Sequence, residues 1–350
     1  MRRRPEFGER EGRAIPSPRW GRRAASICSK WGASLWRSLL VALLGLLSAR
    51  HEVDGAELTP GDHTFTVEHG GRARSYIVHV PPGSGASPGP VVLNFHGGGG
   101  HAASQESYSR MNATADREGF VAVYPNGTGH FGARLLTWNA GTCCGSAQKE
   151  NIDDVGFTRA LVDDLARRTH LDRSRVYATG LSNGAMMAYR LAVEASDLVA
   201  AIAPVAGAEV AEFHPRRPMP IMHVHSVDDQ RALYAGGLGP PFPLTNDRVL
   251  HQAVESVIAR WVAFDGCPTP GRTGPTLRGS GKTAAFTATP ITYAPCREGV
   301  EVVLWKLSGS GHVWPGAALD YLPRLLGHGT DVIDANAEMW RFFSRFHRPS

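Results

Sequence analysis

The sequence predicts an α/β fold with a mostly parallel central sheet, an antiparallel N-terminal edge and helices on both faces. Short apolar runs alternate along the chain with segments of helical periodicity, which is typical of a parallel sheet covered on both faces. Two alternating runs on either side of Gly70 and Gly71 indicate a leading hairpin, which would form the antiparallel edge. No long Ser/Thr/Pro linker divides the chain, so we expect one domain over residues 57–348.

After the hairpin, strands and helices are expected in alternation. The short apolar runs predict strands over residues 91–95, 120–125, 175–180, 199–207, 220–225 and 300–308. The helical patterns predict one helix that ends near residue 118 and others over 153–169, 183–195, 249–264 and 331–346. Asp153 and Asp154 stand where a helix dipole favours anions. We interpret them as helix-terminal structure rather than as catalytic residues.

Residues 1–56 form a basic tail. The first 50 residues contain 11 Lys/Arg and 3 Asp/Glu, a net charge of +8, whereas the rest contain 26 and 29, a net charge of −3. The apolar run Ser38–Ala49 has the length of a signal-peptide h-region and is short for a membrane span. We expect a secreted, extracellular or periplasmic protein after cleavage, with an N-terminal membrane anchor as the alternative. The mildly acidic body argues against a nucleic-acid partner.

The cysteines favour disulfide bonds. Cys28 lies in the tail, and the other four leave an even set in an exported domain. We favour a Cys267–Cys296 bond, which would close a Gly/Pro/Thr-rich segment between a helix and a strand. Cys143 and Cys144 would then form a vicinal bridge or remain two thiols. No Cys-x-x-Cys or His spacing supports the rival reading, metal binding.

The stretch "TGLSNGAMM" places Ser182 between two glycines, after a predicted strand and before a predicted helix. A strand, a sharp turn and a helix are the setting of a nucleophile elbow, which exposes the serine hydroxyl at the carboxyl edge of the sheet. A serine nucleophile needs a base, and that base needs an acid to orient it. His312 follows the last predicted strand in a Gly-rich loop. Its place downstream of Ser182 and of the candidate acids agrees with the chain order Ser, acid, His expected in this setting. Asp228 and Asp229 compete for the role of the acid.

The oxyanion hole requires backbone N–H groups that point to the developing negative charge. The residue after the nucleophile, Asn183, would supply one. The Gly-rich turn "NFHGGGGHAAS" after an early strand would supply the other. We choose Gly98 as this donor, with Gly99 next to it as the second choice.

Together these motifs resemble the secreted polyhydroxybutyrate depolymerase and feruloyl esterase family of α/β-hydrolases, including the bacterial LpqC-type esterases. The matching stretches are "NFHGGGG", "TWNAGTCCGSA", "NIDDVGF", "DRSRVYATGLSNGAMMAYRLA", "AAIAPVAG", "HSVDDQRALYAGG" and "GSGHVWPG". The resemblance implies Ser182 as nucleophile and His312 as base. It also implies an acid at the fifth position from His225, which is Asp229, although Ser226 and Val227 replace the family's usual Gly and Thr.

Two tryptophans also match the family. The resemblance implies that Trp138 and Trp314 line the substrate cleft, and a core position is the alternative for Trp138 because large aromatic residues are readily buried.

The function expected from the motifs and the resemblance is that of a secreted serine esterase that works through an acyl-enzyme without a metal or organic cofactor. Its substrate would be a small, oligomeric or polysaccharide ester, either an oligomeric 3-hydroxybutyrate or a feruloyl or acetyl ester. The sequence makes no prediction of oligomeric state. A non-catalytic polymer- or surface-binding protein on the same fold is the alternative. A peptidase of this fold would need a propeller or a lid-sized insertion, and the sequence predicts neither.

Overall fold

The computed structural model describes residues 58–84, 87–132, 134–242, 247–318 and 322–348. The expected signal segment Ser38–Ala49 and the rest of the tail lie outside these residues. Within the described ranges, no helix is long and apolar enough to cross a membrane.

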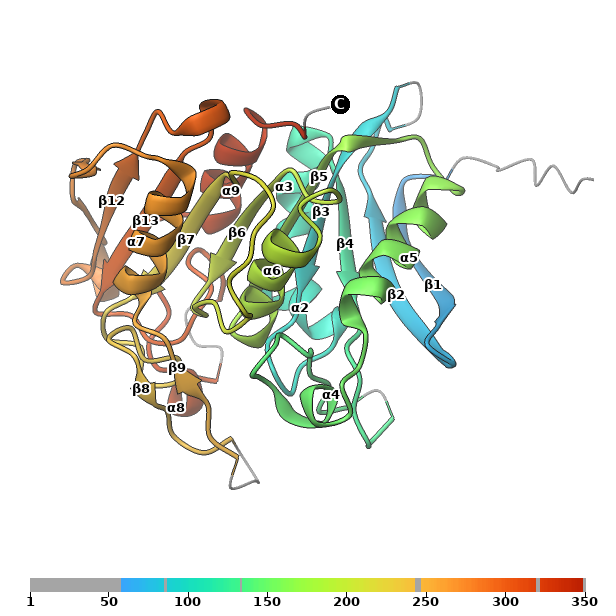
Figure 1. Ribbon diagram of the computed structural model, residues 1–350, viewed down its shortest axis with the longest axis horizontal. Coiled ribbons are helices and arrows are strands. Elements are labelled where there is room, and N and C mark those ends of the chain that lie inside the picture. The colour runs from blue at the N-terminus through green and yellow to red at the C-terminus, as the bar shows by residue number, and fades with distance from the viewer. Residues whose placement is uncertain (1–57, 85–86, 133, 243–246, 319–321, 349–350) are drawn as a thin grey trace, which may run out of the picture. The chain divides into compact units, whose positions relative to one another are not determined.

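An eleven-stranded mixed sheet forms the centre of the described chain (Figure 1). Its order is β1-β2-β4-β3-β5-β6-β7-β13-β12-β10, and β11 pairs with β12. Its strands are β1 (Gly61–His69), β2 (Arg72–Val80), β3 (Gly89–Phe95), β4 (Val121–Pro125), β5 (Leu171–Leu181), β6 (Ala201–Val205), β7 (Ile221–Ser226), β10 (Arg272–Thr273), β11 (Leu277–Arg278), β12 (Thr287–Tyr293) and β13 (Val302–Ser308). Pairing is parallel from β4 through β3, β5, β6 and β7 to β13. The predicted fold class is confirmed.

The N-terminal edge is the expected hairpin. β1 and β2 pair antiparallel from Gly61 opposite Val80 to His69 opposite Arg72. The turn residues Gly70 and Gly71 have φ values of 59° and 71°, which glycine adopts without the steric cost that a Cβ would bring.

The C-terminal edge differs from the prediction. The Gly/Pro/Thr-rich segment between the helix expected over 249–264 and the strand expected over 300–308 contributes three antiparallel strands, β10, β11 and β12, and β12 pairs along its length with β13. β10 and β11 are two exposed residues each. Strands that short carry no alternating pattern that a sequence could reveal.

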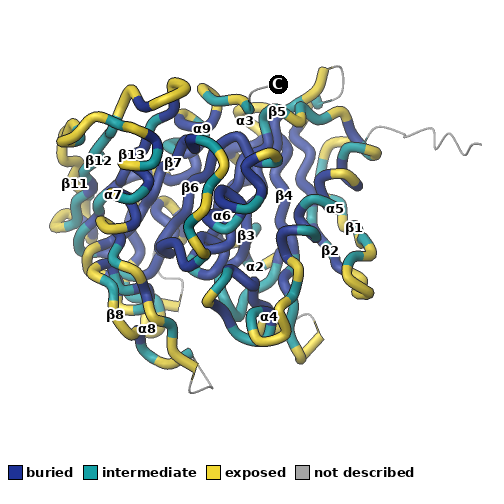
Figure 2. Tube along the Cα trace, viewed as in Figure 1, coloured by how far each residue is buried: buried dark blue, intermediate teal, exposed yellow. Residues whose placement is uncertain are grey.

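Helices cover both faces of the sheet (Figure 1). One face carries α5 (Asp154–Ala166), α6 (Asn183–Glu194) and α7 (Val254–Asp265), and the other carries α2 (Ala102–Ser109), α3 (Met111–Glu118) and α9 (Ala335–Phe343). The apolar side chains form one large core cluster on each face. β3 shows why, because Val91 and Leu93 point to one face and Val92 to the other. Figure 2 shows the buried central strands between the two helix layers.

Two predicted helix boundaries were wrong. The helix that ends near residue 118 is two helices, separated at Arg110, whose φ is 55°. The helix expected from residue 249 begins at Val254, because Leu250–His251 forms a short strand, β9, paired with β8 (Gly237–Leu238). Beyond one end of the central strands, at the bottom of Figure 1, lie this β8–β9 ladder, α4 (Gly145–Lys149) and α8 (Pro323–Leu326). Two 3-10 turns complete the assignment, Gly281–Thr283 and Arg297–Gly299.

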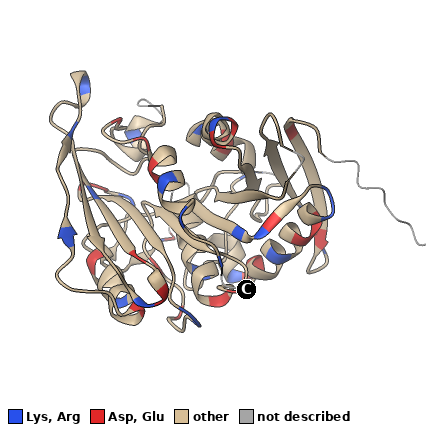
Figure 3. Cartoon of the chain, turned by 90° about the horizontal axis from the view of Figure 1, so that it is seen from above, with Lys and Arg blue, Asp and Glu red and all other residues tan. Residues whose placement is uncertain are grey.

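Charged residues of both signs are interspersed along the helices and loops (Figure 3). The two signs are also nearly equal in number, since the chain after residue 50 contains 26 Lys/Arg and 29 Asp/Glu.

Candidate active site

Ser182 lies at a sharp turn between β5 and α6. Its φ and ψ are 58° and −116°, a conformation that non-glycine residues rarely adopt. The turn brings strand and helix so close that a Cβ on Gly180 would lie 2.6 Å from the carbonyl carbon of Gly184 on α6. Glycine at position 180 is therefore required by the close approach, as a nucleophile elbow demands.

His312 lies in the loop after β13 and contacts a carboxylate. Its Nδ1 is 2.8 Å from Oδ2 of Asp229, and both side chains are buried. The neighbouring Asp228 is used differently, since its Oδ2 accepts a hydrogen bond from the backbone N–H of Gly309. Of the two candidate acids, the structure places Asp229 against His312.

Asp229 supplies the negative charge of the His312–Asp229 pair. Burial alone would raise the pKa of its carboxyl. The charge of His312 and the hydrogen bonds from His225 and His312 outweigh burial and lower that pKa well below its usual range. The backbone N–H groups of Arg231 and Ala232 donate to its other oxygen at 2.7 and 2.9 Å. Asp229 is thus a fixed anion that orients His312 and can stabilise a positive charge on its ring.

One pocket of about 80 Å³ brings Gly98, Ser182, Asn183 and His312 together. Its other lining residues are Cys144, Met186, Arg231, Pro240, Phe242, Val249, His251, Leu325 and Leu326. These residues were not identified from the sequence, because most lie in Gly- and Pro-containing loops without periodicity. The sequence contains 15 histidines, and no local signal marks His251 as a residue of the Ser182 pocket.

The Gly-rich turn after β3 borders the elbow. A Cβ on Gly97 would lie 3.6 Å from the Cβ of Ser182, so the two backbones are close neighbours. The N–H of Gly99 already donates to the carbonyl of Leu136 at 2.8 Å, whereas Gly98 faces the Ser182 pocket. This geometry favours Gly98 over Gly99 as an oxyanion donor. A Cβ on Gly98 would lie 2.5 Å from the ring of Phe242.

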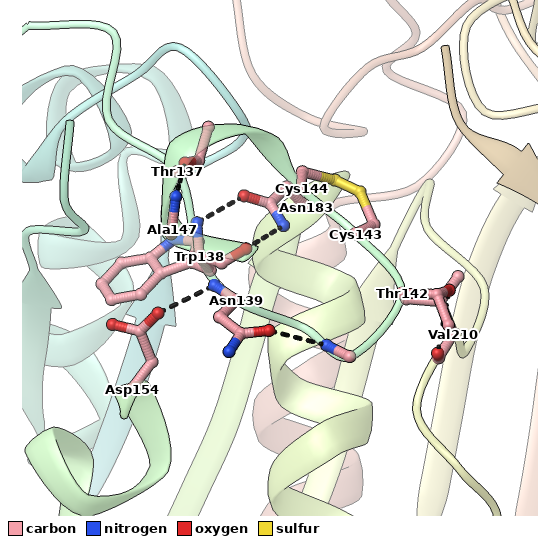
Figure 4. The surroundings of a disulfide bond; sticks show 11 residues. Thr137, Trp138, Asn139, Thr142, Cys143, Cys144, Ala147, Asp154, Asn183 and Val210 are labelled. Carbon is pink, nitrogen blue, oxygen red and sulfur yellow. Dashed lines mark hydrogen bonds between the residues drawn. A yellow bond between two sulfur atoms is a disulfide. The ribbon is translucent and has the colours of Figure 1, made fainter. Parts of the chain in front are cut away.

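The side chain of Asn183 holds the loop that contains the cysteine pair (Figure 4). Its Oδ1 accepts from the backbone N–H of Trp138 at 2.7 Å, and its Nδ2 donates to the carbonyl of the same residue at 3.0 Å. Cys144 donates to that carbonyl as well. The residue that would supply an oxyanion N–H from its backbone therefore anchors this loop through its side chain.

The two tryptophans predicted to line the cleft are core residues. The ring of Trp138 is fully buried, donates to the carbonyl of His96 at 3.0 Å and packs edge-on against Phe95. Trp314 is 1% exposed and donates from Nε1 to Asn336 at 3.0 Å. Both predictions as cleft residues were wrong, since a large aromatic ring is readily buried once its N–H has a partner.

A buried ion pair lies behind the Trp138 loop. Arg74 on β2 and Asp154 on α5 are 2.7 Å apart and are 3% and 0% exposed. Asp154 also accepts from the backbone N–H of Asn139 at 2.8 Å (Figure 4). Asp153 accepts from the N–H of Gly156 as the N-cap of α5. Both aspartates therefore have the structural roles expected of them.

The structure contains two disulfide bonds among the described residues, Cys267–Cys296 and the vicinal Cys143–Cys144. The first is the pairing favoured from the sequence, and the second realises one of the two alternatives left open. Cys144 is part of the wall of the Ser182 pocket. The described ranges contain no group of three His, Cys, Asp or Glu residues arranged to hold a metal ion.

Comparison with known proteins identifies the family. The family "Esterase PHB depolymerase" matches residues 74–265. NocK of Nocardia uniformis subsp. tsuyamanensis, provisionally named an esterase, is 31% identical over 273 residues, covering 73% of this chain and 75% of NocK. Feruloyl esterase B of Piromyces equi is 29% identical over 247 residues, covering 68% of this chain and 42% of that enzyme. The chain thus spans less than half the length of the Piromyces protein.

A solved structure supports the fold alone. The acetyl xylan esterase from Aspergillus awamori superposes with a TM-score of 0.51 at 14% identity, covering 81% of this chain and 99% of the other.

Proposed function

As a member of the esterase PHB depolymerase family, this chain is an ester hydrolase, and we propose that it is a serine esterase that works through an acyl-enzyme. One observation carries the proposal. A single pocket contains Ser182 in a strained turn, the backbone of Gly98, and His312 held by Asp229. These are the parts that acyl transfer requires.

In the proposed mechanism, Ser182 attacks the ester carbonyl. Because Nδ1 of His312 is engaged by Asp229, its Nε2 is the nitrogen that takes the serine proton and then passes it to the leaving alcohol. The backbone N–H groups of Gly98 and Asn183 stabilise the oxyanion. Water then attacks the acyl-enzyme by the same route in reverse and releases the acid.

The proposed substrate is a small or oligomeric ester, either 3-hydroxybutyrate oligomers or feruloyl or acetyl esters of polysaccharide. The Ser182 pocket is small, and a second cavity of about 350 Å³ shares Cys144, Phe242 and Val249 with it. The second cavity also includes the exposed Phe131 and Leu135. An apolar wall that continues beyond the nucleophile suits a flat or extended substituent on one side of the ester. We also propose that the catalytic domain, residues 57–348, acts outside the cell after the tail is removed.

The proposal is tested first on the nucleophile. Ser182→Ala should reduce hydrolysis of a short-chain nitrophenyl ester by at least about a thousandfold while the thermal unfolding transition is retained. A fluorophosphonate should label Ser182 in the wild type. Labelling at another residue, or a fully active variant, would reject the serine mechanism. An inert wild type with an intact fold would instead favour the non-catalytic polymer-binding alternative.

The substrate class is tested by competition. 3-Hydroxybutyrate oligomers, a feruloyl sugar ester and an acetylated xylan oligomer are offered together, and the ratio of kcat/KM values ranks them. A preference for long-chain triglycerides over all three would contradict the proposed substrate class.

A further inference from the structure

A chain of buried hydrogen bonds leads away from Asp229 into the core. We call Tyr189, His223 and His225 the histidine relay. The hydroxyl of Tyr189 on α6 is 2.9 Å from Nδ1 of His223 on β7, and Nε2 of that ring is 3.0 Å from Nδ1 of His225. Nε2 of His225 then lies 2.8 Å from the carbonyl oxygen of Ala232 and 3.2 Å from Oδ2 of Asp229. His223 and His225 are two residues apart on a strand and therefore share a face.

The direction of this chain follows from its last acceptor. The carbonyl of Ala232 can only accept, so Nε2 of His225 carries the hydrogen. With the single hydrogen of the His225 ring on Nε2, its Nδ1 accepts and Nε2 of His223 donates to it. Nδ1 of His223 in turn accepts from the hydroxyl of Tyr189. The hydrogens therefore run from Tyr189 through His223 to His225, whose Nε2–H donates to the Ala232 carbonyl and lies 3.2 Å from Oδ2 of Asp229.

Burial supports this assignment at the far end of the relay. Burial, together with the neighbouring His225, lowers the pKa of His223 well below its ordinary value, so the ring is neutral. Burial raises the pKa of Tyr189 well above 10, so its hydroxyl keeps its proton.

The groups around the relay leave Asp229 as its dominant charge. Burial lowers the pKa of the nearby His251 to about 4, which keeps that ring neutral too. The other titratable or charged groups facing the relay, Asp229 or His312 have partners of their own. Glu209, whose pKa burial raises to about 7, pairs with Arg260. Glu255 pairs with Lys306 and Tyr234, and Asp228 accepts from the Gly309 N–H. Arg231 contacts the carbonyl of Pro241 through its side chain.

We propose that the histidine relay is a positioning device for Asp229: it fixes the His225 ring so that Nε2–H, which donates to the Ala232 carbonyl, also lies 3.2 Å from the carboxylate oxygen that holds His312. The inference rests on the proposed serine-esterase function. Oδ2 of Asp229 lies 2.8 Å from Nδ1 of His312 and 3.2 Å from Nε2 of His225. Oδ1 accepts hydrogen bonds from the backbone N–H groups of Arg231 and Ala232. Rotation of the carboxylate would break several of these bonds at once. The relay also takes up part of the negative charge that would otherwise act on His312 alone.

The first test removes the donor. His225→Leu should lower kcat about tenfold without changing KM, because a hydrogen bond to a charged group is lost and no substrate contact is involved. The acid-side midpoint of the kcat/KM–pH profile should rise by about half a pH unit or more, since the full charge of Asp229 then stabilises protonated His312. His225→Gln places an amide N–H near the former Nε2 and should restore the wild-type midpoint.

The second test works from the far end. Tyr189→Phe removes only a hydroxyl and should shift the midpoint in the same direction by a smaller amount. The matched control is Tyr177→Phe, which removes the hydroxyl of another buried tyrosine, one that donates to the carbonyl of Phe346 at 2.7 Å away from the relay. The control should leave the midpoint unchanged. If His225→Leu does not fold, this pair decides the question alone.

Three outcomes separate the possibilities. A midpoint and kcat unchanged in His225→Leu would overturn the inference, and so would a Tyr189→Phe profile identical to that of Tyr177→Phe. Absence of fluorophosphonate labelling at Ser182 in the wild type would instead reject the proposed function on which the relay depends.

Discussion

The two sides of the Ser182 pocket are held in different ways. We define the oxyanion side as Arg74, Asp154, Trp138 and Asn183. There the Arg74–Asp154 ion pair and the two hydrogen bonds between the Asn183 amide and the Trp138 backbone, which we call the amide clamp, hold the Trp138 loop. On the acid–base side, which we define as His312, Asp229 and the histidine relay, histidine and tyrosine rings lead to one carboxylate. The difference follows from the work proposed for each side. N–H donors must only stay in place, so permanent charges can hold them, whereas a base must gain and lose a proton and needs partners that leave its charge adjustable.

The largest effect is expected at the one charge of the acid–base side. Asp229→Asn should lower kcat by about ten-thousandfold, because the amide favours the wrong tautomer of His312. The matched control is Asp228→Asn, which alters only the contact with the Gly309 N–H and should cost less than about tenfold. Steady-state kinetics on both variants measures this, and a crippled Asp228→Asn enzyme would reverse the assignment.

The oxyanion side should instead respond in stability. Arg74→Met leaves the buried Asp154 without its cation and should lower the free energy of unfolding by about 3–5 kcal/mol. Arg72→Met is the control, because the Arg72–Glu150 pair is exposed and should contribute about 1 kcal/mol or less. Urea denaturation compares the two. Equal losses would mean that the buried pair does not support this side of the pocket.

The amide clamp should affect turnover more than its contribution to stability suggests. Asn183→Ala keeps the backbone N–H but frees the Trp138 loop, and we expect kcat to fall by about tenfold or more. Asn336→Ala removes a comparable buried amide, bonded to Trp314 and the carbonyl of Ser109, away from the nucleophile. It should reduce the melting temperature and spare kcat, so a similar kcat loss in both variants would contradict a specific role for the clamp.

Among the described residues, Asp265 is a buried carboxylate without an ion-pair partner like that of Asp154, so it shows how such a group affects stability as the pH changes. Oδ2 of Asp265 has no hydrogen-bond partner, and burial raises the pKa of this group from 3.8 to about 7. The folded state therefore keeps a proton that the unfolded state loses, and stability falls as pH rises from about 4 to 7. Asp265→Asn removes this dependence and should gain about 2 kcal/mol over the wild type between pH 5 and pH 8. A constant difference across that range would show that Asp265 does not titrate as proposed.

The sequence could predict features that are local or fixed by chain order. The hairpin at Gly70 and Gly71, the turn at Ser182 and the loop position of His312 each have a short-range signal. The choice between Asp228 and Asp229 needed the family spacing, because both occupy the same loop and only the direction of each side chain differs.

Features set by distant contacts could not be predicted in the same way. Trp138 and Trp314 match the family motifs, but their burial depends on partners such as His96 and Asn336 that lie far away in sequence. The tautomers of His223 and His225 depend on a backbone carbonyl at Ala232. No pattern of residue types along one segment carries that information.

The ring of Phe242 lies against Gly98 but belongs to a part of the chain outside the central sheet. It belongs to the loop between β8 and β9, whose two-residue ladder is a sheet of its own and does not pair with the strands that carry Ser182, Asp229 and His312. Substitutions there can change the shape of the entrance while the central sheet keeps its pairing. If the chain is the proposed esterase, we expect substitutions at Phe242 to change which esters it accepts while its thermal unfolding is retained, so a directed-evolution library would best be focused there.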